Sequence, residues 1–146
     1  MSKKDLSIVI VNYKSWRVLA ECLNSFDQYT PKLNYEIIVV DNDSQDEKLK
    51  PFSQKYPKVT FIKNTGNNGF AHGCNLGVNS SHGEFLLFLN PDTVLTNNTA
   101  IDEMFNFARH NPDIGIVTCR RINSKGRPER EMAFASPWLI ISWIRA

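Results

Sequence analysis

The feature that most limits the fold of this chain is an alternation of short apolar runs with segments of helical periodicity. The apolar runs are SIVIVNY (7–13), YEIIVVDN (35–42), VTFIKN (59–64), EFLLFLN (84–90) and IGIVTCR (114–120). Apolar residues are nearly continuous in each run, without the polar alternation of a strand that has one face in water. The runs therefore predict strands that are buried on both faces, as in a parallel sheet covered by helices.

The segments between these runs predict helices. Ser15 is placed to cap the first helix, and a short polar helix is predicted over residues 47–55. Apolar residues keep helical spacing in the longer helices: Leu19, Cys22, Leu23 and Phe26 in the first, Ala71, Cys74 and Val78 in the third, and Ile101, Met104, Phe105 and Ala108 in the fourth. Strands joined by helices imply right-handed parallel crossovers, so the sequence predicts an α/β fold with a doubly wound, mostly parallel sheet and helices on both faces.

The length and composition are those of one globular domain, with 146 residues of which 42% are hydrophobic and 22% charged. The 17 basic and 15 acidic residues are spread along the chain and give a net charge of +2. No basic stripe suggests nucleic acid as a partner, and small ligands are expected instead. Residues 1–146 are therefore treated as a single domain, in which INSKGRPERE (122–131) is a polar loop.

The sequence favours a cytoplasmic location. The apolar run near the N-terminus is interrupted by Asp5 and ends at Asn12, so it is too short for the core of a signal peptide. The cysteines are widely spaced and form no CxxC pair, which indicates buried free thiols in a reducing compartment. No stretch has the length of a transmembrane helix, although WLIISWI (138–144) could touch a membrane surface.

Polar side chains gather directly after the predicted strands. In an open parallel sheet, ligands bind outside the carboxyl ends of the strands, where the following loops converge. The loops bring carboxylates and amides to this edge: Asn12, Asp41, Asp43, Asn67, Asn68, Asn90 and Asp92. The segment NYKSW after the first strand contains neither GxGxxG nor GxxxxGK, which disfavours a dinucleotide site or a P-loop.

A site without phosphate-binding glycines can neutralise a diphosphate with a metal ion that carboxylates hold. Mg²⁺ and Mn²⁺ prefer oxygen ligands, and magnesium often uses one or two carboxylates together with substrate phosphates. Asp92 follows the rigid Pro91 at the end of the fourth strand and suits this role. Each motif also has an ordinary interpretation, because NPDT is a common turn, VDNDS is typical of an Asx loop, and a single His72 is more often a packing or loop residue.

Taken together, the motifs resemble a known family. SIVIVNYKSWRVLAECLNSF, EIIVVDNDSQD and NTGNNGFAHGCNLGVNSSHGEFLLFLNPDT are similar to the N-terminal half of family 2 glycosyltransferases with the GT-A fold. The similarity covers residues 6–135 and is greatest to a bacterial rhamnosyltransferase-like branch, in which the metal motif often reads NPD in place of DxD.

The resemblance implies a site for a nucleotide diphosphate sugar. Asn12, Tyr13 and Asp41 would line the pocket for the base and ribose. Asp92 matches the aspartate that ligates the divalent metal, Mg²⁺ or Mn²⁺. Asn90 stands where many members have the first aspartate of the motif, which lowers the negative charge of the site.

The segment NNGF matches the part of the family that shapes the pocket beside the diphosphate and the sugar. The residues concerned are Asn68, Gly69 and Phe70, with Asn75 nearby. The implied reaction transfers a sugar, rhamnose in this branch, to a hydroxyl of a polysaccharide or lipid-linked glycan, with inversion at the anomeric carbon. A metal would stabilise the leaving diphosphate, and a carboxylate would take the proton of the acceptor.

The catalytic base of the family has no counterpart in this chain, so the catalytic residue is unassigned. None of the carboxylates after Asp92 matches the acidic base motif: Asp102, Glu103, Asp113, Glu129 and Glu131. The chain has about half the length expected for the family, and its apolar end, PWLIISWIRA, has little left to pack against. It is therefore expected to be a donor domain without its acceptor half, as a truncated product, a fragment or one piece of a split enzyme.

Two alternatives remain open. The chain could be a catalytically inactive protein that binds nucleotide sugars. A nucleotidyltransferase is less favoured, because it would need a glycine-rich and basic loop after the first strand, where this chain has NYKSW. Peripheral membrane contact is a corollary of the acceptor that the family resemblance implies, whereas the apolar segment PWLIISWIRA also suits a partner that covers it.

Overall fold

The computed structural model of the chain describes residues 3–44, 47–119, 122–123, 126–127 and 143–145. Its elements follow the order β1 (Lys4–Asn12), α1 (Trp16–Gln28), β2 (Tyr35–Asp41), α2 (Leu49–Lys55), β3 (Val59–Lys63), α3 (Phe70–Asn79), β4 (Gly83–Leu89), α4 (Ala100–His110) and β5 (Trp143–Arg145). The strands form a 5-stranded sheet in the order β3-β2-β1-β4-β5, in which the first four are parallel and β5 is antiparallel to β4. The predicted α/β fold with a mostly parallel sheet is confirmed.

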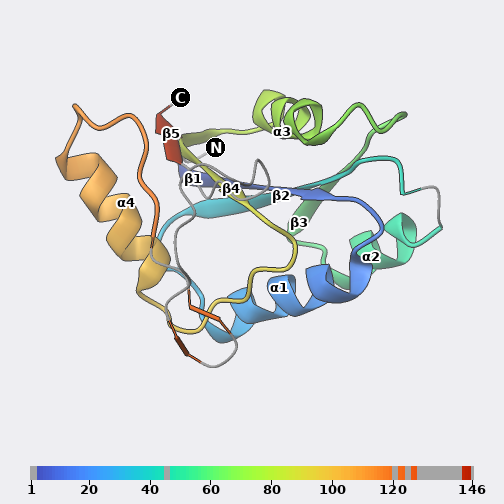
Figure 1. Cartoon of the computed structure of the whole chain (residues 1–146), viewed down its shortest axis with the longest axis horizontal. Coiled ribbons are helices and arrows are strands. Elements are labelled where there is room, and N and C mark those ends of the chain that lie inside the picture. The colour runs from blue at the N-terminus through green and yellow to red at the C-terminus, as the bar shows by residue number, and fades with distance from the viewer. Residues whose placement is uncertain (1–2, 45–46, 120–121, 124–125, 128–142, 146) are drawn as a thin grey trace.

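The helices cover the two faces of the sheet (Figure 1). On β1, Leu6, Ile8 and Ile10 belong to the main core, which also contains the buried apolar residues of α1 and α4. Val9 and Val11 point to the opposite face, where they meet α3. Because successive side chains of a strand point to opposite faces, a continuous apolar run is what a sheet covered on both sides requires.

The packing of α1 and α4 follows the predicted apolar stripes, since all the residues named for these two helices are buried. The packing of α3 does not follow its predicted stripe. Its buried residues are Gly73 and Gly77, whereas Ala71 is exposed. A Cβ atom at Gly77 would lie 2.3 Å from Cγ1 of Val9, so the helix approaches the sheet through its glycines and not through its larger apolar side chains.

The prediction of a fifth strand at residues 114–120 was wrong. Residues 114–119 form no strand, and residue 120 lies outside the described residues. The place beside β4 is taken by Trp143–Arg145, with Leu86 paired to Ile144, so this part of the apolar C-terminal segment has a partner in the sheet. An apolar run indicates strand propensity, but which segment pairs with β4 depends on contacts between distant parts of the chain.

Other differences are small. The second helix begins at Leu49 and not near residue 47. Ser15 is the N-cap of α1 as predicted, but its hydroxyl makes no capping hydrogen bond and instead donates to Oδ1 of Asn12 at 2.9 Å. None of the described helices combines the length and the apolar character that a bilayer span requires.

Candidate functional site

The order of strand addition reverses between β1 and β4, which are parallel neighbours in the sheet. From β1 the chain moves to β2 and then to β3 on one side, whereas β4 lies on the other side of β1. Ligands of open α/β sheets bind at such a switch point, beyond the carboxyl ends of the strands. Ile10 is paired with Leu89, so the segments that start at Asn12 and Asn90 leave the sheet next to each other.

The carboxyl ends of β1 and β2 are joined by a buried network around Asp41. Oδ1 of Asp41 accepts hydrogen bonds from Nδ2 of Asn12, at 3.2 Å, and from the hydroxyl of Ser44. Asn12 and Asp41 are 0% and 2% exposed. The structure therefore brings these predicted residues together, and they tie the loops after β1 and β2 to each other.

Ser44 extends this network to the exposed residues after β1. Its Oγ accepts a hydrogen bond from the backbone N–H of Lys14 at 3.0 Å, where the backbone has a φ of 56°. This left-handed conformation is uncommon for a residue other than glycine, and the hydrogen bond helps to hold it. The neighbouring Tyr13 ring is 46% exposed, with Nζ of Lys14 5.1 Å from its centroid. The corner thus presents an aromatic ring and a cation at the end of β1.

Four of the predicted residues lie at the start of α3 or in its second turn. Gly69 precedes the helix with a φ of 88°, a value that favours glycine, and no side chain caps the helix. Asn68 is exposed, Phe70 is half-buried in the first turn, and Asn75 is exposed one turn later. This group is on the α3 side of the sheet, whereas Asn12 and Asp41 are on the α1 side.

Asp92 is exposed after β4, and Asn90 is half-buried. Burial raises the pKa of the Cys22 thiol in α1 to about 12, and the negative charge of Asp92 adds to this increase. The loop that contains Asp92 runs along α1, because the backbone N–H of Leu95 donates a hydrogen bond to Oγ of Ser25 at 3.1 Å. This is the same side of the sheet as Asn12 and Asp41.

The residues present fit a metal ion only if the substrate completes its coordination. Within the described ranges, no group of three or more His, Cys, Asp or Glu side chains is arranged to hold a metal ion. Asp41 is already engaged by Asn12 and Ser44. Of the other carboxylates predicted for this edge, Asp92 is exposed and Asp43 is half-buried. One carboxylate together with phosphate oxygens is a common arrangement for magnesium.

Two residues that contribute to this edge were not predicted from the sequence. Ser44 connects Asp41 to Lys14, and Asn42 connects β2 to the loop before α3 through hydrogen bonds to Asn64 and Asn67. Both follow Asp41 closely in VDNDS, and the alternation of side chains along a strand could have indicated that Asp41 and Asn42 face opposite sides.

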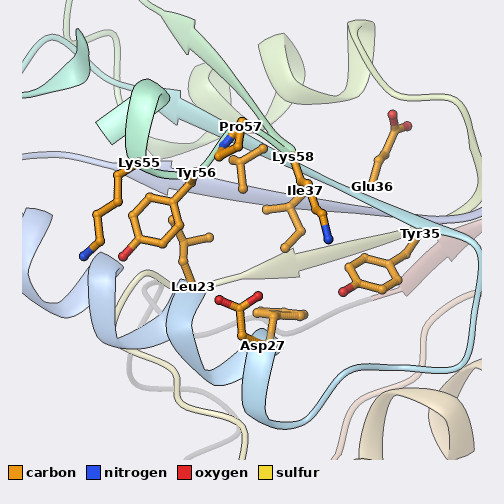
Figure 2. A pocket seen from close by; sticks show the side chains of 11 residues that line it. Leu23, Asp27, Tyr35, Glu36, Ile37, Lys55, Tyr56, Pro57 and Lys58 are labelled. Carbon is orange, nitrogen blue, oxygen red and sulfur yellow. The ribbon is translucent and has the colours of Figure 1, made fainter. Parts of the chain in front are cut away.

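A separate groove lies at the opposite edge of the sheet, near the amino ends of β2 and β3 (Figure 2). Its volume is about 420 Å³, and it is bounded by the C-terminal half of α1, the start of β2 and residues 55–59. Its lining includes Asp27 and Glu36 as well as Lys55 and Lys58, so the charges are of both signs. None of the predicted site residues lines it.

The fold and the polar edge define a class of α/β protein that binds its ligand at a switch point between strands. Within this class, residues 7–144 match the family model of glycosyl transferase family 2. The chain belongs to this family.

The match extends to named relatives and to solved structures. A poly(ribitol-phosphate) beta-glucosyltransferase of Bacillus spizizenii is 33% identical over 138 residues, which cover 90% of this chain and 22% of the relative. S. aureus TarS 1–349 in complex with UDP-GlcNAc has a TM-score of 0.74 at 21% identity and covers 97% of this chain and 45% of that one. The mannosyltransferase PcManGT of Pyrobaculum calidifontis, in complex with GDP-Man and Mn²⁺, has a TM-score of 0.71 at 20% identity, covering 83% of this chain and 37% of that one.

The chain therefore spans less than half the length of each of these proteins. The structural matches support the GT-A-like fold, and the family model identifies the chain as a member of glycosyl transferase family 2. The resemblance to a rhamnosyltransferase-like branch is not reflected in the relatives named above.

Proposed function

We propose that this chain is the donor domain of a glycosyltransferase and binds a nucleotide diphosphate sugar at the carboxyl ends of β1, β2 and β4. The observation that carries the proposal is the edge of the sheet at its switch point, where the Asn12–Asp41–Ser44 network and Asp92 lie on one side and the start of α3 on the other. Two solved structures with the same fold contain nucleotide sugars, which supports this class of ligand.

The exposed and the buried residues of this edge have different proposed roles. The Tyr13 ring offers an apolar face on which a nucleotide base can stack. Asn12 and Asp41 have almost no exposed surface, so their main contribution is to hold the loops that form the base and ribose pocket. Asn68, Gly69 and Phe70 are proposed to line the pocket beside the diphosphate and sugar, with Asn75 and Asn90 nearby.

Asp92 is the proposed ligand for a divalent metal ion, Mg²⁺ or Mn²⁺. A bound metal would neutralise charge on the leaving diphosphate. The amide of Asn90 brings no second negative charge to the site, so the substrate phosphates would have to supply the other anionic ligands. Metal affinity without nucleotide is therefore expected to be weak.

The proposed reaction is transfer of the sugar to a hydroxyl acceptor with inversion at the anomeric carbon. No residue of this chain is assigned as the base. The carboxylate of Asp102 in α4 has a structural partner, because Oδ1 and Oδ2 accept hydrogen bonds from the backbone N–H of Lys32 at 3.0 and 3.2 Å. The proposed base is therefore a carboxylate that a separate acceptor half supplies.

The sugar and acceptor are proposed only as classes. Rhamnose follows from the branch resemblance alone, whereas the relatives named above are described with glucose, N-acetylglucosamine and mannose donors. The acceptor is proposed to be a cell-surface polysaccharide or a lipid-linked glycan. The donor site would then work in the cytoplasm, at or near the membrane surface.

The donor site can be tested by thermal denaturation with UDP, GDP and dTDP sugars, each with Mn²⁺, with Mg²⁺ or with a chelator. A nucleotide at ten times its dissociation constant stabilises the folded chain by about 1.4 kcal/mol, which raises the melting temperature by about 3–6 °C. Asp92→Ala should abolish the part of this shift that depends on metal. It should leave the metal-independent part intact, because the base and ribose contacts remain.

Asp113→Ala is the matched control, since Asp113 is an exposed aspartate in the turn after α4. It should bind nucleotide and metal like the unmodified chain. If no nucleotide sugar changes the melting temperature, the proposed donor site is wrong. If a labelled donor binds but no label reaches an acceptor even with the acceptor half supplied, the inactive binding protein becomes the better hypothesis.

A further inference from the structure

A chain of amide groups joins the ends of β2 and β3 to the loop before α3. Oδ1 of Asn42 accepts a hydrogen bond from Nδ2 of Asn64, and Nδ2 of Asn42 donates to Oδ1 of Asn67, both at 2.7 Å. Asn42 and Asn64 are 3% and 5% exposed. Buried amides of this kind must keep both ends paired, because a group left unpaired loses its interaction with water without compensation.

One backbone group sets the donor and the acceptor of each hydrogen bond among the amides of Asn42, Asn64 and Asn67. The N–H of Gly69 can only donate, and it lies 3.2 Å from Oδ1 of Asn67. The oxygen of Asn67 must therefore face Asn42, which turns Nδ2 of Asn42 toward Asn67 and leaves its oxygen for Asn64. Nδ2 of Asn42 also lies 3.4 Å from the carbonyl oxygen of Gly69, a second acceptor.

The same direction extends to His72 in the first turn of α3. Nδ2 of Asn64 donates to Asn42 and lies 3.3 Å from Nδ1 of His72, so the second N–H of the Asn64 amide is directed at the imidazole ring. The amide chain thus contacts both the loop before α3 and the helix itself.

We propose that Asn42 is a positioning residue of the donor site and acts through the loop that contains Asn68 and Gly69. This inference rests on the proposed function, because that loop and Phe70 are the segment assigned there to the diphosphate and sugar. Asn42 is too buried to contact a substrate. Its carboxamide holds the loop at the end of β2 through Oδ1 of Asn67 and the carbonyl oxygen of Gly69, and so positions the start of α3.

The sharpest test is Asn42→Asp, which keeps the shape of the side chain but replaces its donor by an acceptor. A carboxylate oxygen would then face both Oδ1 of Asn67 and the carbonyl oxygen of Gly69. Titration calorimetry with a nucleotide sugar and Mn²⁺, well below the melting temperature of every variant, should show at least tenfold weaker binding. In the free protein, hydrogen exchange at residues 66–70 should be faster than in the unmodified chain.

Two controls separate positioning from charge and from general stability. Asn98→Asp introduces the same charge at an exposed loop residue without a side-chain hydrogen bond in the described structure, and should change affinity less than twofold. Phe105→Leu weakens the core at α4, away from the loop, and should also leave affinity and exchange at residues 66–70 unchanged. If Asn42→Asp does not fold, Asn42→Ala removes the donor without adding charge and should still weaken binding at least threefold.

The outcomes distinguish this inference from the function on which it rests. If the unmodified chain binds a nucleotide sugar and the Asn42 variants bind it equally tightly, only the positioning role is overturned. If Phe105→Leu weakens binding as much as Asn42→Asp, general loss of stability explains the effect and the positioning role is also overturned. Absence of binding in the unmodified chain would overturn the proposed function and this inference together.

Discussion

At the scale of single residues, neighbouring side chains at the end of β2 join different networks. Asp41 points to the α1 side and bonds Asn12 and Ser44, whereas Asn42 points to the α3 side and bonds Asn64. The sequence VDNDS indicated a polar edge and a role for Asp41 but gave no partner for either residue. Hydrogen-bond partners 22 and 29 positions away in the chain become visible only in the folded protein.

The opposite edge of the sheet contains a carboxylate whose function is structural. Oε1 of Glu36 accepts hydrogen bonds from Oγ of Ser7 and from the backbone N–H of His82, both at 2.6 Å. Burial acts to raise the pKa of Glu36, but the hydrogen bonds from Ser7 and His82 outweigh burial and lower this pKa below its usual value. Because the folded state favours the ionised form, Glu36 stabilises the fold above the pKa that it has in the unfolded chain.

We expect Glu36→Gln to lower the free energy of unfolding at pH 7 by about 1–2 kcal/mol, since a charge-assisted hydrogen bond becomes a neutral one. The difference from the unmodified chain should shrink as the pH falls through the folded-state pKa, where the carboxyl group is protonated. Urea denaturation between pH 3 and pH 7 measures this dependence. Glu47→Gln, at an exposed glutamate, should show almost no difference, and an equal effect of both substitutions would contradict the assignment.

At the scale of elements, α3 shows how spacing can identify a helix without identifying its buried face. The regular spacing of Ala71, Cys74 and Val78 indicated a helix, and Phe70–Asn79 is one. The face against the sheet consists of Gly73 and Gly77, because β-branched Val11 and Val9 fill the space that larger helix residues would need. Hydrophobicity alone favours the wrong face, since glycine contributes little to an apolar stripe.

We expect Gly77→Ala to destabilise the fold by about 1–3 kcal/mol, although alanine is the better helix former, because its Cβ would overlap with Val9. Chemical denaturation of Gly77→Ala, Val9→Ala and the double variant forms a double-mutant cycle. The double variant should be more stable than the sum of the single effects predicts. Gly115→Ala is the control, because no atom lies within 4 Å of its added Cβ, and additive effects in the cycle would contradict the packing argument.

At the scale of the whole molecule, stability depends on the layer between the sheet and the helices α1 and α4. The ring of Phe105 in α4 meets that of Phe85 in β4 edge to face, with centroids 5.3 Å apart, and is 3% exposed. Phe107, two residues further along the same helix, is 51% exposed. The two residues therefore separate the contribution of the core from that of the helix surface.

We expect Phe105→Ala to lower the free energy of unfolding by about 3–5 kcal/mol, since it removes buried surface and leaves a cavity. Phe107→Ala should change it by less than about 0.5 kcal/mol, because that ring already contacts water. Guanidinium denaturation of both variants provides the measurement. A large effect of Phe107→Ala would show instead that its exposed ring packs against another part of the protein.

The sequence by itself determined the kinds and order of the elements as far as α4, the doubly covered sheet and the polar edge at the carboxyl ends of its strands. These features follow from local periodicity and from the residues next to each strand, which the chain carries wherever it folds. The tertiary structure alone decided that Trp143–Arg145 and not residues 114–119 lies beside β4, that α3 packs through its glycines, and that Asp41 and Asn42 serve opposite sides of the sheet. Each of these depends on a contact between distant segments, whose geometry is fixed only when the sheet and its two helical layers have assembled.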